Sequence, residues 1–87
     1  MSDLKNLPNI SDKVADELHR VGINSSEHLF KLGSVKAFCQ ITRNHPLTGY
    51  NLLYALEGAI RGVRWHSLDR EHLNRIRKEY DEWISKV

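Results

Sequence analysis

The sequence predicts an all-α protein, a compact five-helix domain that spans residues 1–87. Apolar residues recur three and four positions apart in every long segment, and no segment of useful length alternates between apolar and polar residues as a strand would. The length of 87 residues is typical of one small domain, and 40% hydrophobic with 28% charged residues is typical of globular proteins. No low-complexity tract or linker divides the chain, so we expect one unit to fold together.

The first two helices are short and have recognisable ends. We expect the first over about residues 12–20, because the hydroxyl of Ser11 can accept a hydrogen bond from a free amide of the first turn and Gly22 ends the helix. Either Asn24 or Ser25 caps the second helix, which ends at Gly33. The apolar residues predicted to line these two helices are Val14, Leu18, Val21, Leu29, Phe30 and Leu32.

The remaining three helices are longer. Ser34 is expected to cap the third helix, and Pro46 places a loop at about residues 44–49. The fourth helix is predicted over about residues 48–61 and the fifth over about residues 69–85. The residues predicted to face inward on the third helix are Val35, Phe38, Cys39 and Ile41. The apolar stripe of the fourth helix is Leu52, Leu56, Ala59, Ile60 and Val63, and one face of the fifth carries Leu73, Ile76, Tyr80, Trp83, Ile84 and Val87.

Two glycines and the single cysteine have predicted structural roles. Gly58 and Gly62 lie four residues apart in the fourth helix; we expect Gly58 to permit close packing of another segment and Gly62 to be the C-cap. Cys39 stands alone, which excludes an internal disulfide and a four-cysteine zinc site. Its apolar neighbours predict a buried thiol.

Positive charge is concentrated near the C-terminus, although the formal net charge of the chain is only +2. Residues 1–58 hold six basic and six acidic side chains, which cancel. Residues 61–78 hold six basic side chains against two acidic ones, a local net charge of +4. Such clustering is a better indication of a nucleic-acid partner than the overall charge.

Two stretches carry a resemblance to a known family. LPNISDKVADELHRVGI, residues 7–23, is typical of the start of a helix-hairpin-helix, and residues 51–65, NLLYALEGAIRGVRW, follow the family's residue order closely. Together they resemble the C-terminal domain of the TfoX/Sxy competence regulators, over roughly residues 4–78. The resemblance implies a compact fold akin to helix-hairpin-helix and SAM-like domains, in proteins associated with turning on DNA-uptake genes together with a cyclic-AMP receptor protein. The sequence lacks the N-terminal domain of those regulators, so we expect a stand-alone copy, and the resemblance assigns no site residue.

The hairpin departs from the pattern of hairpins that grip DNA. There, glycines flank a hydrophobic residue so that backbone amides can approach a phosphate, but here the positions are Asn9, Ile10 and Ser11. Asparagine tolerates left-handed dihedral angles and Ser11 can cap the next helix, so the turn is predicted to survive. Lys13 is placed for a phosphate contact, whereas two nearby aspartates oppose an anion. We therefore favour a structural hairpin over a phosphate clamp.

A basic face of the last helix is the first candidate binding surface. Arg70, Asn74 and Arg77 fall at spacings that place them opposite the apolar stripe, where they could lie along a duplex backbone. The alternative is a solvated face partly neutralised by Glu71 and Asp81 in i,i+4 pairs. No motif for reading base sequence is present, so the expected partner is double-stranded DNA bound without sequence preference. The residues assigned to nucleic acid are Lys13, Arg61, Arg64, Arg70, Arg77 and Lys78.

The apolar end of the last helix is the second candidate. If Tyr80, Trp83 and Ile84 run past the rest of the domain, they expose aromatic area suited to a protein partner or a second copy of the chain. The predicted function is an accessory DNA-associated or transcription-linked binding module; the alternative is a SAM-like protein-interaction domain. Trp65, directly after the fourth helix, is expected to pack in a corner between helices.

Catalysis finds little support in the sequence. The five histidines form no i,i+4 pair for a metal, no serine or cysteine lies in a nucleophile motif, and no glycine-rich phosphate loop occurs. His66 and His72 flank the start of the last helix, where a cap or surface role is expected. We therefore expect no enzyme activity, no cofactor and no metal. The N-terminus has no signal peptide, and no apolar run approaches the ~20 residues of a membrane helix, so we expect a cytoplasmic protein that does not bind membranes.

Overall fold

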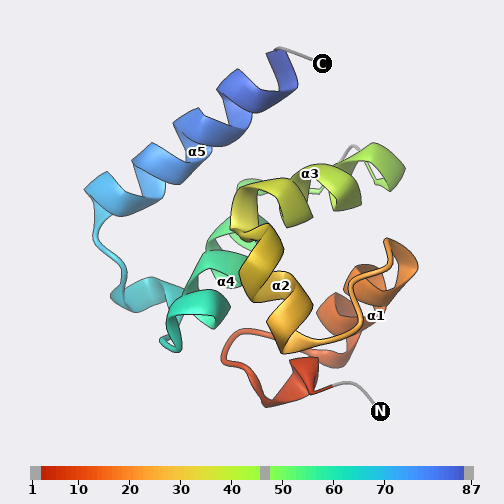
Figure 1. Ribbon diagram of the computed structural model, residues 1–87. Coiled ribbons are helices and arrows are strands. Elements are labelled where there is room, and N and C mark those ends of the chain that lie inside the picture. Colours follow the sequence, from red (N-terminus) through yellow and green to blue (C-terminus); the bar gives the residue numbers. More distant parts are fainter. Residues whose placement is uncertain (1–2, 46–47, 86–87) are drawn as a thin grey trace.

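The computed structural model describes residues 3–45 and 48–85, and over these ranges the protein is all-α, as predicted (Figure 1). Its α-helices are α1 (Asp12–Arg20), α2 (Ser26–Leu32), α3 (Ser34–Asn44), α4 (Tyr50–Arg61) and α5 (Arg70–Ser85). Two short 3-10 helices that the periodicity did not predict, η1 (Leu4–Asn6) and η2 (Trp65–Ser67), lie before α1 and between α4 and α5. The predicted helix limits agree with the structure to within one or two residues. Pro46 and Val87 lie outside the described residues.

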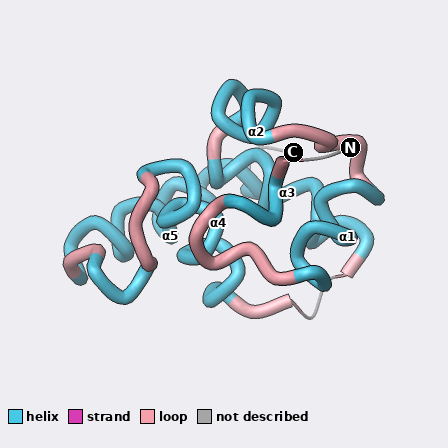
Figure 2. Tube along the Cα trace, turned by 90° about the horizontal axis from the view of Figure 1, so that it is seen from below, coloured by secondary structure: helices cyan, strands magenta, loops and turns pink. Residues whose placement is uncertain are grey.

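The helices α3 and α4 form the centre of the domain. They pack on each other, α5 packs on both of them, and α1 packs on α3. Figure 1 shows α5 on one side of this central pair and α1 on the other, and the view from below in Figure 2 shows the same order. The whole domain measures 34 × 28 × 22 Å. Surfaces on α1 and on α5 therefore belong to opposite sides of the molecule.

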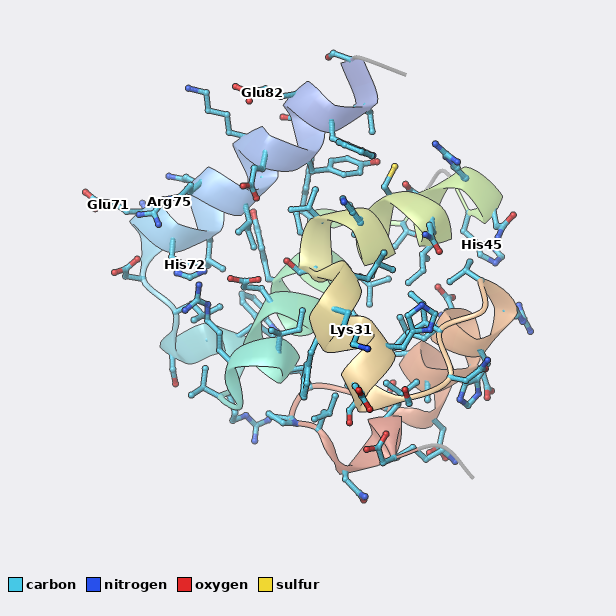
Figure 3. The ribbon with its side chains drawn as sticks, in the orientation of Figure 1. Lys31, His45, Glu71, His72, Arg75 and Glu82 are labelled. Carbon is cyan, nitrogen blue, oxygen red and sulfur yellow. The ribbon has the colours of Figure 1, made fainter. Side chains whose placement is uncertain are left out.

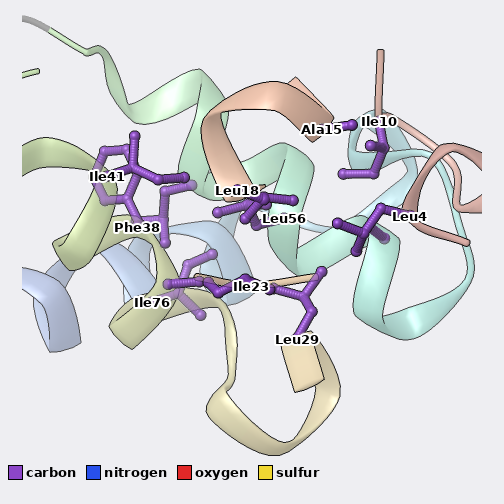
Figure 4. Close-up of a cluster of buried hydrophobic side chains, with 13 residues drawn as sticks. Leu4, Ile10, Ala15, Leu18, Ile23, Leu29, Phe38, Ile41, Leu56 and Ile76 are labelled. Carbon is purple, nitrogen blue, oxygen red and sulfur yellow. The ribbon is translucent and has the colours of Figure 1, made fainter. Parts of the chain in front are cut away.

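The core is a single cluster of apolar side chains contributed by every α-helix (Figure 4). It contains Leu18 from α1, Leu29 from α2, Phe38 from α3, Leu56 from α4 and Ile76 from α5. Burial of these stripes is the main source of stability, because each buried large apolar side chain contributes roughly 1.5–3 kcal/mol. The predicted inward stripes are therefore confirmed in their main positions.

Apart from Trp83 and Ile84 at the end of α5, two residues of the predicted apolar stripes lie at the surface. Phe30 is 46% exposed, because α2 has only two turns and Leu29 already occupies its core-facing position. Val63 is exposed because Gly62, with a φ of +76°, ends α4 in the left-handed conformation and takes the chain out of the helical register. The prediction that Gly62 is the C-cap is thereby confirmed.

The helix caps follow the prediction at two helices and differ at a third. The Ser11 hydroxyl accepts from the Val14 amide at 3.3 Å, and the Ser25 hydroxyl accepts from the His28 amide at 3.1 Å, so Ser25 rather than Asn24 caps α2. Ser34 is wrong as a cap: it is the first residue of α3, it is buried, and its side chain points to another helix. Gly33, with a φ of +87°, holds the cap position because it both ends α2 and begins α3.

Cys39 is buried as predicted, at 5% exposure. It belongs to α3 and is a free cysteine. A buried thiol in apolar surroundings behaves as a small hydrophobic group.

Candidate partner and nucleic-acid interfaces

The hairpin before α1 keeps its turn, and the turn makes hydrogen bonds to another part of the domain. Asn9 adopts a φ of +69°, the left-handed conformation that the sequence predicted it would tolerate. Its side-chain amide donates to the Val63 carbonyl at 2.9 Å, and its side-chain oxygen accepts from the Trp65 amide at 3.2 Å. The hairpin is therefore tied to the corner between α4 and η2, in agreement with the prediction of a structural hairpin.

Gly58 leaves the space that the hydrogen bonds of Asn9 need, and the prediction of close packing at this glycine is confirmed. An added Cβ would lie 2.6 Å from the side-chain nitrogen of Asn9 and 2.7 Å from the Val63 carbonyl oxygen. Trp65 packs in the same corner, half-buried, with its ring 5.6 Å from that of Tyr54. The corner role predicted for Trp65 is confirmed as well.

The residues that the sequence assigned to nucleic acid do not form one surface. Lys13 is exposed on α1, at the rim of a hollow of about 730 Å³ that also borders Trp65, and so lies across the molecule from α5 (Figure 1). Arg64, Arg70 and Lys78 are exposed near η2 and on α5. Among the ion pairs of residues 3–45 and 48–85, none includes these four side chains.

Arg77 is exposed on α5, and its guanidinium also contacts α4. Its guanidinium carbon lies 4.1 Å from the centre of the Tyr50 ring, so the side chain turns back over α4. Hydrogen bonding to Tyr54 and Tyr50 raises the pKa of the Arg77 guanidinium. The reason is geometric: Arg77 is only 100° around the helix from the buried Ile76, and an arginine is long enough to reach back from that flank.

The i,i+4 ion pairs that would have neutralised this helix face do not form between Glu71 and Arg75 or between Arg77 and Asp81 in the described chain. Asp81 instead accepts from the Tyr50 hydroxyl at 2.8 Å. This bond to a carboxylate raises the pKa of Tyr50. Tyr50, Arg77 and Asp81 thus satisfy one another on one flank of α5.

A polar cluster that sequence reasoning missed joins three helices at Glu57. Its Oε1 accepts from the Ser34 hydroxyl at 2.7 Å. Its Oε2 accepts from Arg61 Nε at 2.8 Å and meets His72 Nε2 at 2.5 Å. Burial raises the pKa of the Glu57 carboxyl, but these three hydrogen bonds outweigh burial and the pKa lies below its ordinary value. The available signal was a glutamate within the apolar run of α4, four residues before an arginine.

His72 is therefore not a surface residue: its side chain is only 17% exposed and connects α5 to α4. Figure 3 shows it on the N-terminal half of α5 beside Arg75, with Glu82 near the other end of the helix. Arg61 is committed to Glu57 through its Nε, although its side chain is half exposed.

A groove of about 500 Å³ runs between α3 and α5 beside this cluster. Its apolar residues are Leu32, Val35, Ile76 and Trp83. Its exposed cations are Lys36 on α3, Arg75 on α5 and Arg61 on α4, of which Arg61 is paired with Glu57. The ammonium nitrogen of Lys36 lies 5.5 Å from the centre of the Trp83 ring. We call this the α3–α5 groove.

Of the three residues assigned to a protein partner, one packs inward and two are exposed. Tyr80 packs inward, with its ring 4.8 Å from that of Phe38 and its hydroxyl 3.0 Å from the Thr42 hydroxyl. Trp83 and Ile84 are 40% and 44% exposed on the last turns of α5. The apolar stripe of α5 thus continues beyond the packed part of the helix.

No three histidine, cysteine, aspartate or glutamate side chains within residues 3–45 and 48–85 come together in a way that could hold a metal ion. None of the described helices is long and apolar enough to cross a membrane.

Comparison with known proteins links the chain to one family and to two solved structures. The sequence model of the TfoX C-terminal domain matches residues 1–80. A triclinic crystal structure of an uncharacterised protein from Listeria monocytogenes is 36% identical, covers 92% of this chain and 91% of its own, and superposes with a TM-score of 0.85. A tetragonal crystal structure of a protein of unknown function from the same organism is 36% identical, with 93% and 99% covered and a TM-score of 0.85. No curated protein matches the sequence significantly.

Proposed function

This chain belongs to the TfoX C-terminal domain family, and from that premise we propose that it is a non-enzymatic, cytoplasmic regulatory module that docks a protein partner. The family indicates a regulatory domain related to competence. The proposed docking surface is the α3–α5 groove together with the exposed end of α5.

The observation that carries the proposal is the exposure of Trp83 and Ile84 on adjacent positions of α5. A tryptophan side chain gains more from burial than almost any other residue, and at protein interfaces it is among the residues whose truncation costs most. Here the indole borders a groove instead of filling the core, while Tyr80, one turn earlier, is packed. The end of α5 therefore presents apolar area that only a partner would bury.

We expect Trp83→Ala to weaken partner binding by about 2 kcal/mol, roughly 30-fold, because it removes the largest apolar contact of the surface. A photoreactive benzoylphenylalanine in place of Ile84 identifies the partner in cells by cross-linking and mass spectrometry, and calorimetry with the purified pair gives the dissociation constants. The same probe in place of Lys78, which is exposed on α5 and does not line the groove, is the control. A partner that cross-links equally from both positions, or binds the Trp83 variant unchanged, contradicts the proposed surface.

Non-specific binding of double-stranded DNA is the second candidate, and a separate observation favours it. Arg64, Arg70 and Lys78 are exposed near the start of α5 and on it, and no ion pair among the described residues engages them. Three cations free to contact phosphates would release counterions on binding, which makes affinity fall with salt.

For this candidate, we expect a fluorescein-labelled duplex of about 20 base pairs to bind about 40-fold more weakly at 200 mM than at 50 mM salt, as about three phosphate contacts require. An Arg64→Glu/Arg70→Glu variant should bind at least tenfold more weakly in the same anisotropy titration. Arg20→Glu/Arg43→Glu, an equal double charge reversal at exposed positions at the end of α1 and near the end of α3, is the matched control. Absence of binding at 50 mM by the folded protein, or equal losses in both variants, excludes this DNA surface.

A further inference from the structure

We propose that the α3–α5 groove recognises an acidic segment of the partner that carries one or two large apolar side chains. This inference rests on the proposed function, because it names the chemistry of the partner at the same surface. The inference rests on three observations: some charges of the groove are already paired, others are unpaired, and apolar side chains lie between the unpaired charges.

The acidic group at the bottom of the groove has no remaining capacity for a ligand. Both oxygens of Glu57 already interact with Ser34, Arg61 and His72. Burial and these donors hold the carboxylate inside the domain. A cationic partner segment would therefore find no carboxylate to pair with at this point.

The free charges on the two walls are mainly positive. Lys36 on α3 and Arg75 on α5 line opposite walls, and no ion pair of the described residues engages either of them. Glu79 is the exposed acid among the groove residues. With Arg61 and Glu57 cancelling each other, Lys36 and Arg75 stand against Glu79, so the groove has a net charge of +1. This excess is complementary to carboxylates that flank a bound segment.

The apolar area lies between these two cations. Trp83, Val35 and Ile76 border the groove, and the exposed Trp83 ring has Lys36 at 5.5 Å. A volume of about 500 Å³ accommodates one or two large side chains, not the surface of a folded domain. The fitting occupant is therefore a short segment in which leucine-like anchors alternate with aspartate or glutamate.

The other flank of α5 does not offer the same chemistry. There the guanidinium of Arg77 is placed over Tyr50, and Tyr50 donates to Asp81. These groups satisfy one another, so a ligand on that flank would have to break existing contacts. The charge that remains free beside exposed apolar area is on the groove side.

The test uses the full chain and three fluorescein-labelled twelve-residue peptides in anisotropy titrations. The first places two leucines among aspartates, the second replaces the aspartates with lysines, and the third replaces the leucines with serines. We expect the folded protein to bind the first peptide at least tenfold more tightly than either of the others. A Lys36→Glu/Arg75→Glu variant should lose at least tenfold in affinity for the first peptide and gain affinity for the second.

Arg70→Glu/Lys78→Glu is the matched double control, because both residues are exposed on α5 and neither lines the groove. Circular dichroism confirms that each variant is folded. The proposal is overturned if the lysine peptide binds as well as the aspartate peptide, or if the groove and control reversals have equal effects. It is also overturned if duplex DNA displaces the peptide and is itself lost in the groove variant, which would assign these cations to nucleic acid. If the peptide fails while cross-linking from position 84 succeeds, the partner chemistry is wrong and the docking surface stands; if both fail, the proposed function fails as well.

Discussion

Gly58→Ala is expected to destabilise the protein by about 2–3 kcal/mol, although alanine is the better helix former by about 1 kcal/mol. The added methyl group would lie 2.6 Å from Asn9 Nδ2, 2.7 Å from the Val63 oxygen and 2.9 Å from the Trp65 nitrogen. Two of these are backbone atoms, so a change of side-chain rotamer cannot relieve the overlap. The corner between α4 and η2 must open, and the hydrogen bonds of Asn9 to Val63 and Trp65 weaken with it.

Urea denaturation followed by circular dichroism measures this loss, which is a large fraction of the ~4–13 kcal/mol expected for a domain of this size. Gly49→Ala is the matched control, because its φ of −80° suits alanine and no heavy atom lies within 4 Å of the added Cβ. The control should change the free energy of unfolding by less than about 1 kcal/mol. A Gly58→Ala variant that is more stable than the natural chain would show that the corner opens without cost. The higher helix propensity of alanine would then determine the change in stability.

Glu57→Gln is expected to cost about 2–3 kcal/mol near neutral pH. The amide keeps the shape of the side chain but removes the charge that accepts from Arg61 and His72, and its NH₂ group faces one of their donors. Glu57 also accepts a hydrogen bond from Ser34. The variant therefore weakens the contacts that join α3, α4 and α5 at this residue. Hydrogen exchange should accordingly increase most in the N-terminal half of α5.

The effect of this substitution depends on pH with a definite sign. The pKa of Glu57 in the folded protein lies below its ordinary value of 4.5, so the unfolded chain binds the proton more readily. The contribution of the carboxylate to stability is therefore fully present above about pH 4.5 and is lost as the pH falls through the lowered folded-state pKa. We expect the stability difference between the natural chain and the Gln variant to shrink correspondingly below pH 4.5.

Urea midpoints measured from pH 7 down to pH 3 provide the comparison. Glu82→Gln, at an exposed position near the end of α5, is the control and should change stability by less than about 0.5 kcal/mol throughout (Figure 3). A Gln variant whose deficit stays constant from pH 7 to pH 3 would show that shape and packing, not the charge of Glu57, hold the three helices together.

The candidate binding surface was only partly predictable. Trp83 and Ile84 were identified because the apolar stripe of the last helix continues for more turns than a small domain can cover. Lys36 and the groove were not, because Lys36 comes from α3 and is brought to Trp83 only when α3 and α5 pack together. The contact of Arg77 with Tyr50 was not predicted, because periodicity gives the angle of a residue around its helix but not the direction in which a long side chain turns.

By itself, the sequence determined the all-α class, the five helices, the cap at Ser11 and about half of the core, including Leu18, Phe38, Leu56 and Ile76. These depend on hydrogen bonds within one turn and on apolar spacing within one helix, so neighbouring residues are sufficient to specify them. Only the tertiary structure decided the bond of Ser34 to Glu57, that of Glu57 to His72, and the tie from Asn9 to Trp65. Those contacts join residues 15 to 56 positions apart in the sequence. A buried polar group needs a hydrogen-bond partner, and the packing of the helices determines which partner lies within reach.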